Sequence, residues 1–108
     1  MYNLLDNALL SMRKRSRKER SVVVRTRLSA MTAVLTVQDV GTGIEDEFRD
    51  LIWKPFFSTW RRGIGSGIGL FMCKYIVEDF HGGRIDFESH CNVGTTFTVE
   101  LPSNVDGI

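Results

Sequence analysis

Four short segments of the chain are predicted β-strands, and they come in two pairs. Residues 22–28 and 33–39 are rich in β-branched side chains and include alternating stretches, which favours strands over helices. The few residues between them make a hairpin the economical connection. Residues 84–89 and 95–101 form the second pair, separated by a turn at residues 92–94.

Two other segments have the spacing of helices with one buried face. Apolar side chains recur at three- and four-residue steps over residues 2–12 and again over residues 68–80, and Gly82 and Gly83 end the second helix. Residues 45–51 can form a short helix between them. This order of elements predicts an α/β two-layer sandwich, whose mixed, mainly antiparallel sheet is covered on one face by helices.

The length and composition fit a single globular domain over residues 1–108. Of the 108 residues, 43% are apolar and 25% are charged, which argues against disorder. No apolar run approaches the ~18 residues of a membrane-spanning helix and no leader opens the chain, so we expect a cytoplasmic domain without membrane contact. Cys73 and Cys91 lack the spacing of a metal or redox motif, and we expect both to be small buried side chains.

The positive charges are concentrated in one stretch. Residues 13–20 hold six of the 14 Lys and Arg residues. No aromatic residue is interleaved with them, and no helix-turn-helix or zinc pattern surrounds them. We therefore expect a solvated helix end rather than a nucleic-acid-binding tail, and no nucleic-acid partner.

Asn3 and Asn7 lie four residues apart in the first predicted helix and therefore share one face. Neutral carboxamides can offer oxygen atoms to a hard cation such as Mg²⁺, which needs few protein ligands when substrate phosphates complete its shell. Taken alone, the pair is more simply explained as a polar helix face without a metal.

Residues 39–44 place a carboxylate, Asp39, at the end of a strand, with Gly41 and Gly43 directly after it. The carboxylate can accept a hydrogen bond from an amino group, and the glycines allow a tight bend. An ordinary Asp-x-Gly turn is the alternative interpretation.

Glycines alternate over residues 63–69 and lead directly into the helix at residues 68–80. Backbone without Cβ atoms can approach phosphates closely, and the N–H groups of a helix N-terminus point at them. The Rossmann and Walker patterns are both missing, since Trp60, Arg61 and Arg62 precede the glycines and no Gly-Lys-Ser/Thr closes the loop. A merely flexible loop remains the alternative.

Taken together and in this order, the segments closely resemble the catalytic, ATP-binding domain of sensor histidine kinases, in the superfamily of gyrase, Hsp90, histidine kinases and MutL. The resemblance runs from Asn3 to Pro102. The matching motifs are the N box at residues 3–8, the G1 box at 39–44, the F box at 53–58, the G2 box at 65–70 and the Gly-Thr element at 94–97.

The resemblance implies a role for individual residues in binding ATP and Mg²⁺. Asn7 would coordinate Mg²⁺, Asp39 would accept a hydrogen bond from the adenine amino group, and Thr95 would assist Asp39 directly or through water. Residues 58–66 would form a mobile lid tethered by Phe56 and Phe57. The implied nucleotide-binding residues are Asn3, Asn7, Asp39, Gly41, Gly43, Ile44, Phe57, Gly65, Gly67, Ile68, Gly69, Leu70 and Thr95, and the implied catalytic residues are Asn3, Asn7, Arg61 and Arg62.

The sequence departs from the family pattern at several positions. Val40 stands where the family often has Asn, and Leu10 and Trp60 stand where many relatives have a cation. The phosphate charge would then be met by Arg61, Arg62 or the backbone. The family also has a strand and the start of a helix before Asn3, so we expect a fold with a truncated N-terminal part, whose sheet edge could pair with a second copy.

The function implied by the resemblance is that of a protein-histidine kinase. Such a domain transfers the γ-phosphate of ATP to a histidine on a separate dimerising hairpin domain, and its signalling partner is the receiver domain of a response regulator. His81 and His90 lack the acidic neighbour of that acceptor, so we expect turn or surface residues. A non-catalytic ATP-responsive binding module and a serine kinase of the anti-sigma-factor type remain the alternatives.

Overall fold

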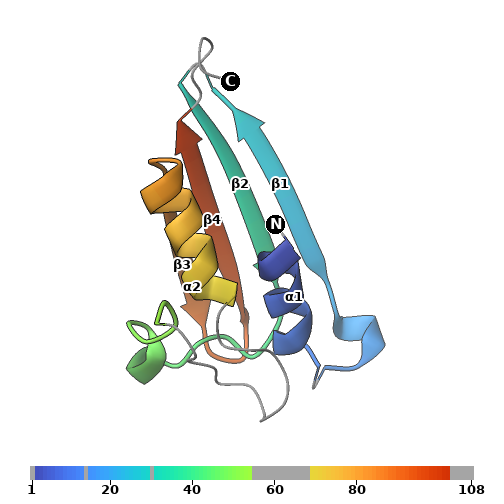
Figure 1. The fold of residues 1–108 in the computed structure, drawn as a ribbon. Coiled ribbons are helices and arrows are strands. Elements are labelled where there is room, and N and C mark those ends of the chain that lie inside the picture. Colours follow the sequence, from blue (N-terminus) through green and yellow to red (C-terminus); the bar gives the residue numbers. More distant parts are fainter. Residues whose placement is uncertain (1, 14, 30, 55–68, 103–108) are drawn as a thin grey trace.

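The structure is a computed structural model that describes residues 2–13, 15–29, 31–54 and 69–102. Helices cover one face of a single four-stranded sheet, with α1 beside β1 and β2 and with α2 beside β3 and β4 (Figure 1). The predicted two-layer α/β sandwich is confirmed. The expected lid at residues 58–66 and most of the expected G2 box lie outside the described residues.

The sheet has the strand order β1-β2-β4-β3, and each neighbouring pair is antiparallel. The strands are β1 (Val22–Leu28), β2 (Thr32–Asp39), β3 (Arg84–His90) and β4 (Gly94–Pro102). All four predicted strands are therefore confirmed, with ends that shift by at most one residue. The predicted sheet was mixed, whereas no parallel pair occurs among the strands that the structure describes.

The central strands β2 and β4 supply the middle of the core. Val37 is paired with Phe97 in the register, and the side chains of both residues are buried on the helix-covered face. Ile85 and Val99 extend this apolar layer on the β3 side. Burial at alternate positions of β4 follows the two-residue period of a strand, which is why one face could be predicted as the inner one.

Two helical segments pack on this layer. Helix α1 (Tyr2–Ser11) buries Leu4 and Ala8, which lie one turn apart, and the second segment buries Cys73 and Val77 with the same spacing. The second segment is α-helical over α2 (Gly69–Lys74) and π-helical over η3 (Tyr75–Phe80). It ends at Gly82, which has φ 71°, as predicted from the two glycines.

The helix predicted at residues 45–51 is wrong in length. Only the 3₁₀ turn η2 (Asp46–Phe48) forms there, followed by further turns. The N–H groups of Phe48 and Arg49 bond to carbonyls three residues earlier, which is the tight pattern of a 3₁₀ helix. The turns that follow bring Ile52 and Trp53 onto the core, so burial of these side chains overrides a regular helix.

Two other expectations need correction. The basic segment is not a helix end, because α1 stops at Ser11 and residues 15–20 form a separate strap with the 3₁₀ turn η1 (Arg17–Glu19). Cys73 is buried as expected, but Cys91 is exposed because it lies in the turn between β3 and β4. None of the helices in the described ranges is long and apolar enough to span a membrane.

Candidate functional site

Asn3 and Asn7 are half-buried on α1, and the α-helix gives them the shared face that was predicted. Asn3 also lies against the start of α2, since a Cβ placed on Gly69 would be 3.6 Å from the Asn3 Oδ1 atom. The amide of Asn3 is within hydrogen-bonding reach of the Cys73 thiol. The polar face of α1 therefore meets the first turns of α2, where the glycine-rich segment ends.

Asp39 ends β2 with a side chain that is only 3% exposed. Its Oδ1 atom accepts hydrogen bonds from the backbone N–H groups of Gly41, at 2.8 Å, and Thr95, at 3.2 Å. Burial raises the pKa of this carboxyl, while the bonds from Gly41, Thr95 and the Ser11 hydroxyl oppose that rise. Both backbone donors bond to the same oxygen, Oδ1.

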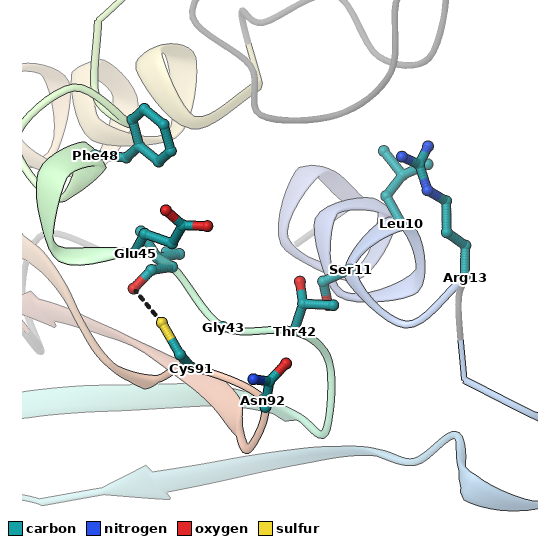
Figure 2. Close-up of a pocket in the computed structure, with 10 residues that line it drawn as sticks. Leu10, Ser11, Arg13, Thr42, Gly43, Glu45, Phe48, Cys91 and Asn92 are labelled. Atoms are coloured by element: carbon teal, nitrogen blue, oxygen red, sulfur yellow. Dashed lines mark hydrogen bonds between the residues drawn. The ribbon is translucent and has the colours of Figure 1, made fainter.

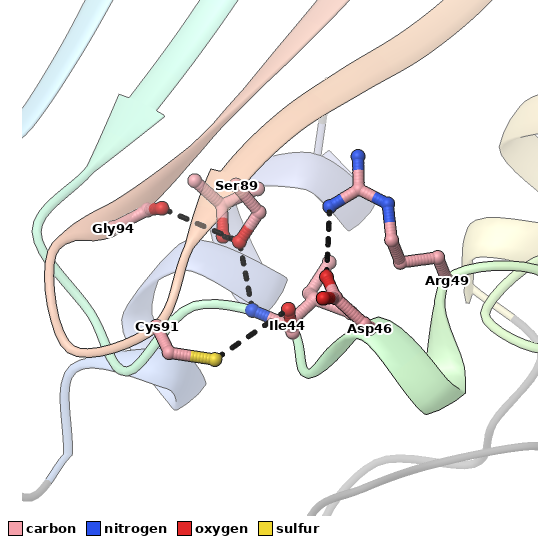
Figure 3. A network of polar contacts seen from close by, with 7 residues as sticks. Ile44, Asp46, Arg49, Ser89, Cys91 and Gly94 are labelled. Carbon is pink, nitrogen blue, oxygen red and sulfur yellow. Dashed lines mark hydrogen bonds and ion pairs between the residues drawn. The ribbon is translucent and has the colours of Figure 1, made fainter.

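Thr95 therefore contacts Asp39 through its backbone N–H group. Its hydroxyl is instead 2.8 Å from the Ser89 Oγ atom. Ser89, which sequence reasoning missed, is buried and also accepts a bond from the Ile44 N–H group at 2.7 Å (Figure 3). Ser89 thereby connects the loop after β2 to the β3–β4 hairpin, a tertiary contact that no local sequence signal marks.

Gly41 and Gly43 have a packing reason that the sequence did not reveal. A Cβ on Gly41 would lie 2.2 Å from the Ser11 Oγ atom, and a Cβ on Gly43 would lie 2.4 Å from the His90 carbonyl oxygen. Gly43 also has φ 78°, which L side chains rarely adopt. The glycines allow the loop to pass between α1 and the β3–β4 hairpin, in addition to any approach of a ligand.

A pocket of about 340 Å³ opens between the end of α1 and this loop. In Figure 2, Leu10 and Phe48 face each other across it, and the Glu45 carboxylate points into it. Its size is that of a small ligand site. The lining residues are Leu10, Ser11, Arg13, Thr42, Gly43, Ile44, Glu45, Phe48, Cys91 and Asn92.

The pocket contains two of the expected nucleotide-binding residues, Gly43 and Ile44, and also the atypical Leu10. Leu10 follows Asn7 by three residues, so the pocket continues the polar face of α1. Asp39 and Thr95 do not line this pocket, but Asp39 bonds to Gly41, which directly precedes the lining residue Thr42. Gly69 and Leu70 lie in the first turn of α2 and are half-buried.

Six expected site residues lie outside the described residues. These are Phe57, Arg61, Arg62, Gly65, Gly67 and Ile68. Among the residues that the structure does describe, no group of three His, Cys, Asp or Glu side chains could hold a metal ion. His81 and His90 are both exposed, as expected of turn or surface residues.

Sequence reasoning missed a further residue that shapes the site. The Arg15 guanidinium group donates to the carbonyl oxygens of Val40, Gly41 and Asn92, at 3.0, 3.2 and 2.7 Å. The Val40 and Gly41 carbonyls directly precede the pocket-lining residues of the loop after β2, and the Asn92 carbonyl belongs to the turn between β3 and β4. A run of cations is usually solvated, so the composition of residues 13–20 gave no signal of this contact.

Known proteins resemble this chain in both sequence and structure. The family model described as histidine kinase-, DNA gyrase B- and HSP90-like ATPase matches residues 1–105. The sensor protein SrrB of Staphylococcus aureus is 34% identical over 106 residues, which cover 94% of this chain and 17% of SrrB. The chain thus spans about a sixth of the length of this curated relative.

Histidine kinase domains are among the similar solved structures. A nucleotide-free catalytic domain of histidine kinase ThkA has a TM-score of 0.76 and 31% identity, over 93% of this chain and 61% of that one. The mycobacterial sensor histidine kinase MprB has a TM-score of 0.73 and 31% identity, over 93% of this chain and 65% of that one. The chain therefore belongs to the histidine kinase-, DNA gyrase B- and HSP90-like ATPases, and within them to the catalytic domains of sensor histidine kinases.

Proposed function

We propose that this chain is the ATP-binding catalytic domain of a sensor kinase, which transfers the γ-phosphate of ATP to a histidine on a separate hairpin domain. The observation that carries the proposal is the buried Asp39 carboxylate, fixed by two backbone donors beside a pocket at the end of α1. A buried ionisable group in such a setting is typical of a functional site.

The base of the nucleotide would lie at the Asp39 end of the site. The Oδ2 atom of Asp39 would accept a hydrogen bond from the adenine amino group, with Leu10 and Ile44 offering apolar surface nearby. The phosphates would extend along the face of α1 that carries Asn7 and Asn3 toward the start of α2. There the backbone N–H groups of the G2 box would meet them.

A magnesium ion is part of the proposal. The donors on α1 fit this ion, because Mg²⁺ prefers oxygen ligands and keeps several waters when phosphates supply the rest of its shell. Asn7 would hold it through the amide oxygen, and Asn3 would contact the phosphates. When bound, the ion would neutralise charge on the transferred phosphate, while Arg61 and Arg62 would add to that effect.

The partners follow from the reaction class. One similar structure is histidine kinase ThkA in complex with the response regulator protein TrrA, with a TM-score of 0.67 and 25% identity. We propose that this chain likewise works with a hairpin domain and a receiver domain in the cytoplasm. Pairing with a second copy at the β1 edge is a further element of this proposal.

A nucleotide-binding module that transfers no phosphate is the second candidate. Leu10 favours it, because this apolar side chain lines the pocket where many relatives carry a cation. The two candidates share the same nucleotide site. They differ only in whether a phosphorylated product forms.

The first experiment tests nucleotide binding. Calorimetric titration of ATP and GTP, with and without Mg²⁺, compares the parent with Asp39→Ala and Asn7→Ala. We expect Asp39→Ala to abolish the preference for adenine and Asn7→Ala to remove the increment that Mg²⁺ gives. Asp6→Ala is the matched control, since Asp6 is exposed on the same helix, and its affinity should equal that of the parent. Equal affinities of the parent for ATP and GTP would contradict the adenine assignment.

The second experiment tests transfer. The domain is mixed with labelled ATP and either a hairpin domain or a candidate regulator protein, and the product is treated with acid. Phosphohistidine is labile in acid and phosphoserine is stable, so the result separates a histidine kinase from a serine kinase. Nucleotide binding without any labelled product would favour the non-catalytic module.

A further inference from the structure

The side chain of Arg15 joins two parts of the chain that are far apart in the sequence. Its Nε atom donates to the Val40 carbonyl at 3.0 Å, and its Nη2 atom donates to Gly41 at 3.2 Å and Asn92 at 2.7 Å. Val40 and Gly41 belong to the loop after β2, and Asn92 belongs to the turn between β3 and β4. The half-buried Arg15 side chain therefore bonds to both the loop after β2 and the β3–β4 turn and joins them.

The chemistry of the contact suits arginine and no other cation. A guanidinium group is planar and presents several N–H donors in fixed directions, so one side chain can satisfy three carbonyls at once. A lysine ammonium group is a single point on a flexible stem and cannot reproduce that fork. The contact therefore fixes the relative position of the loop and the turn, in addition to attracting them.

Backbone bonds complete the same junction. The Asn92 N–H group donates to the Thr42 carbonyl at 2.7 Å, and the Thr42 N–H group donates to the Ser11 carbonyl at 3.2 Å. Ser11, Thr42 and Asn92 all line the pocket. The Arg15 contact to the Asn92 carbonyl therefore reaches a residue that lines this pocket.

Gly41 links Arg15 to the Asp39 carboxylate. The N–H group of Gly41 donates to the Asp39 Oδ1 atom at 2.8 Å, while its carbonyl oxygen accepts from Arg15. The peptide groups on both sides of Gly41 are therefore held. A shift of this loop would move the donor that orients Asp39.

Arg15 is itself held in place before any ligand binds. The backbone N–H group of Arg15 donates to the Met12 carbonyl at 2.8 Å, and the backbone carbonyl oxygen of Arg15 accepts a bond from the Arg20 Nε atom at 3.0 Å. Arg20 also donates to the Arg13 carbonyl at 2.9 Å. The basic strap thus anchors the end of α1 and aims Arg15 at the loop.

We infer that Arg15 is a positioning residue for nucleotide binding, whose guanidinium group holds the loop of residues 40–43 in the shape that accepts the purine. The inference rests on the proposed function, because it needs a nucleotide in this site. Preorganisation raises affinity by removing the cost of ordering the loop when the ligand binds. Loss of Arg15 therefore weakens base recognition more than it weakens contacts to the phosphates.

The test compares the parent with Arg15→Lys and Arg15→Met, and Arg17→Met is the matched control. Arg17 is an exposed cation of the same strap. Affinities for ATP and GTP are measured by competition with a fluorescent nucleotide, and amide hydrogen exchange is followed without ligand. We expect ATP affinity to fall about tenfold or more in Arg15→Lys and further in Arg15→Met, which is the scale of one or more lost hydrogen bonds.

The ratio of ATP to GTP affinity separates positioning from a merely structural role. Partial unfolding lowers both affinities by the same factor, whereas a misplaced loop lowers the preference for ATP. We expect this preference to shrink in both Arg15 variants and the Thr42 and Asn92 amides to exchange faster, while Arg17→Met matches the parent in both measurements.

Three results would overturn the inference. The first is ATP affinity in a folded Arg15 variant within about twofold of the parent, which is less than one hydrogen bond contributes. The second is an equal loss of ATP and GTP affinity. If Arg15→Met fails to fold, Arg15→Lys decides, because it keeps the charge and the stem. A parent that binds no nucleotide is the third result, and it alone would also refute the proposed function.

Discussion

Replacing Asp39 with asparagine separates the support that this carboxylate gives the loop from its proposed contact with the base. Asparagine has nearly the same shape and keeps one oxygen, which can still accept the N–H groups of Gly41 and Thr95. The other oxygen becomes an NH₂ donor. The substitution therefore preserves the support of the loop while it reverses the hydrogen-bonding character of the side that would face the base.

The two effects have different sizes. Each bond from Gly41 and Thr95 changes from a charged to a neutral acceptor, a loss of roughly 1 kcal/mol per bond. Asparagine is neutral, so the cost of burying a negative charge, which raises the pKa of Asp39, disappears and offsets this loss. The free energy of unfolding should therefore change by only about 1 kcal/mol. At the ligand, the adenine amino group would face another donor, and the unpaired groups cost about 2–4 kcal/mol, or roughly 30- to 1,000-fold in affinity.

The assay is calorimetric titration of ATP and GTP, together with chemical denaturation of the same samples. We expect Asp39→Asn to stay folded, to lose ATP affinity in that range and to bind GTP relatively better, since the new NH₂ group can donate to the guanine oxygen. Asp50→Asn, which changes an exposed aspartate, should leave all three quantities unchanged. A folded Asp39→Asn protein that binds ATP as the parent does would refute the role of Asp39 in recognising the base.

Three other predictions concern the same framework. Burial raises the pKa of Asp39 in the folded chain above its ordinary value of about 3.9. Protonated Asp39 therefore stabilises the fold at a pH below the ordinary value, and this stability is lost as the pH rises through the raised pKa of the folded chain. The free energy of unfolding of the parent, measured by denaturation from about pH 3.5 to 6, should therefore fall increasingly below that of Asp39→Asn as the pH rises. A difference between the two proteins that stays constant with pH would contradict this prediction. Gly43→Ala should destabilise the fold by about 3 kcal/mol or more, since its Cβ would meet the His90 carbonyl, whereas Gly82→Ala, also at positive φ but with open space around it, should cost only about 1–2 kcal/mol in the same denaturation assay. Phe97→Ala should cost about 3–5 kcal/mol, because this side chain is only 2% exposed at the centre of the sheet, and a loss below about 1 kcal/mol would contradict that placement.

Local patterns were sufficient to predict the four strands and the two longer helical segments. The strands follow from alternating apolar and polar residues, and the face of α1 follows from the spacing of Leu4 and Ala8. The position of Asp39 at a strand end could be read in the same way, because a strand is expected to stop where two glycines follow. These features depend on neighbours within a few residues.

The contacts that shape the site could not be predicted, because they join distant parts of the chain. Ser89 bonds to Ile44 and Arg15 bonds to Asn92 only once the sheet has formed. In the sequence, Ser89 is one small polar residue of a strand and Arg15 is one cation among six. The helix predicted at residues 45–51 was wrong although the local pattern was clear. There the burial of Ile52 in the core outweighed the local preference for a helix.

The π-helical turn of η3 gives the chain a place where its length can change. At the end of this element the His81 N–H group bonds to the Ile76 carbonyl, five residues back, so the turn holds one residue more than an α-helical turn would. Removal of a single residue there could restore α-helical spacing without displacing either the start of α2 or the start of β3. Related domains that are one residue shorter between these two points can therefore keep the same sheet register and the same approach to the ligand.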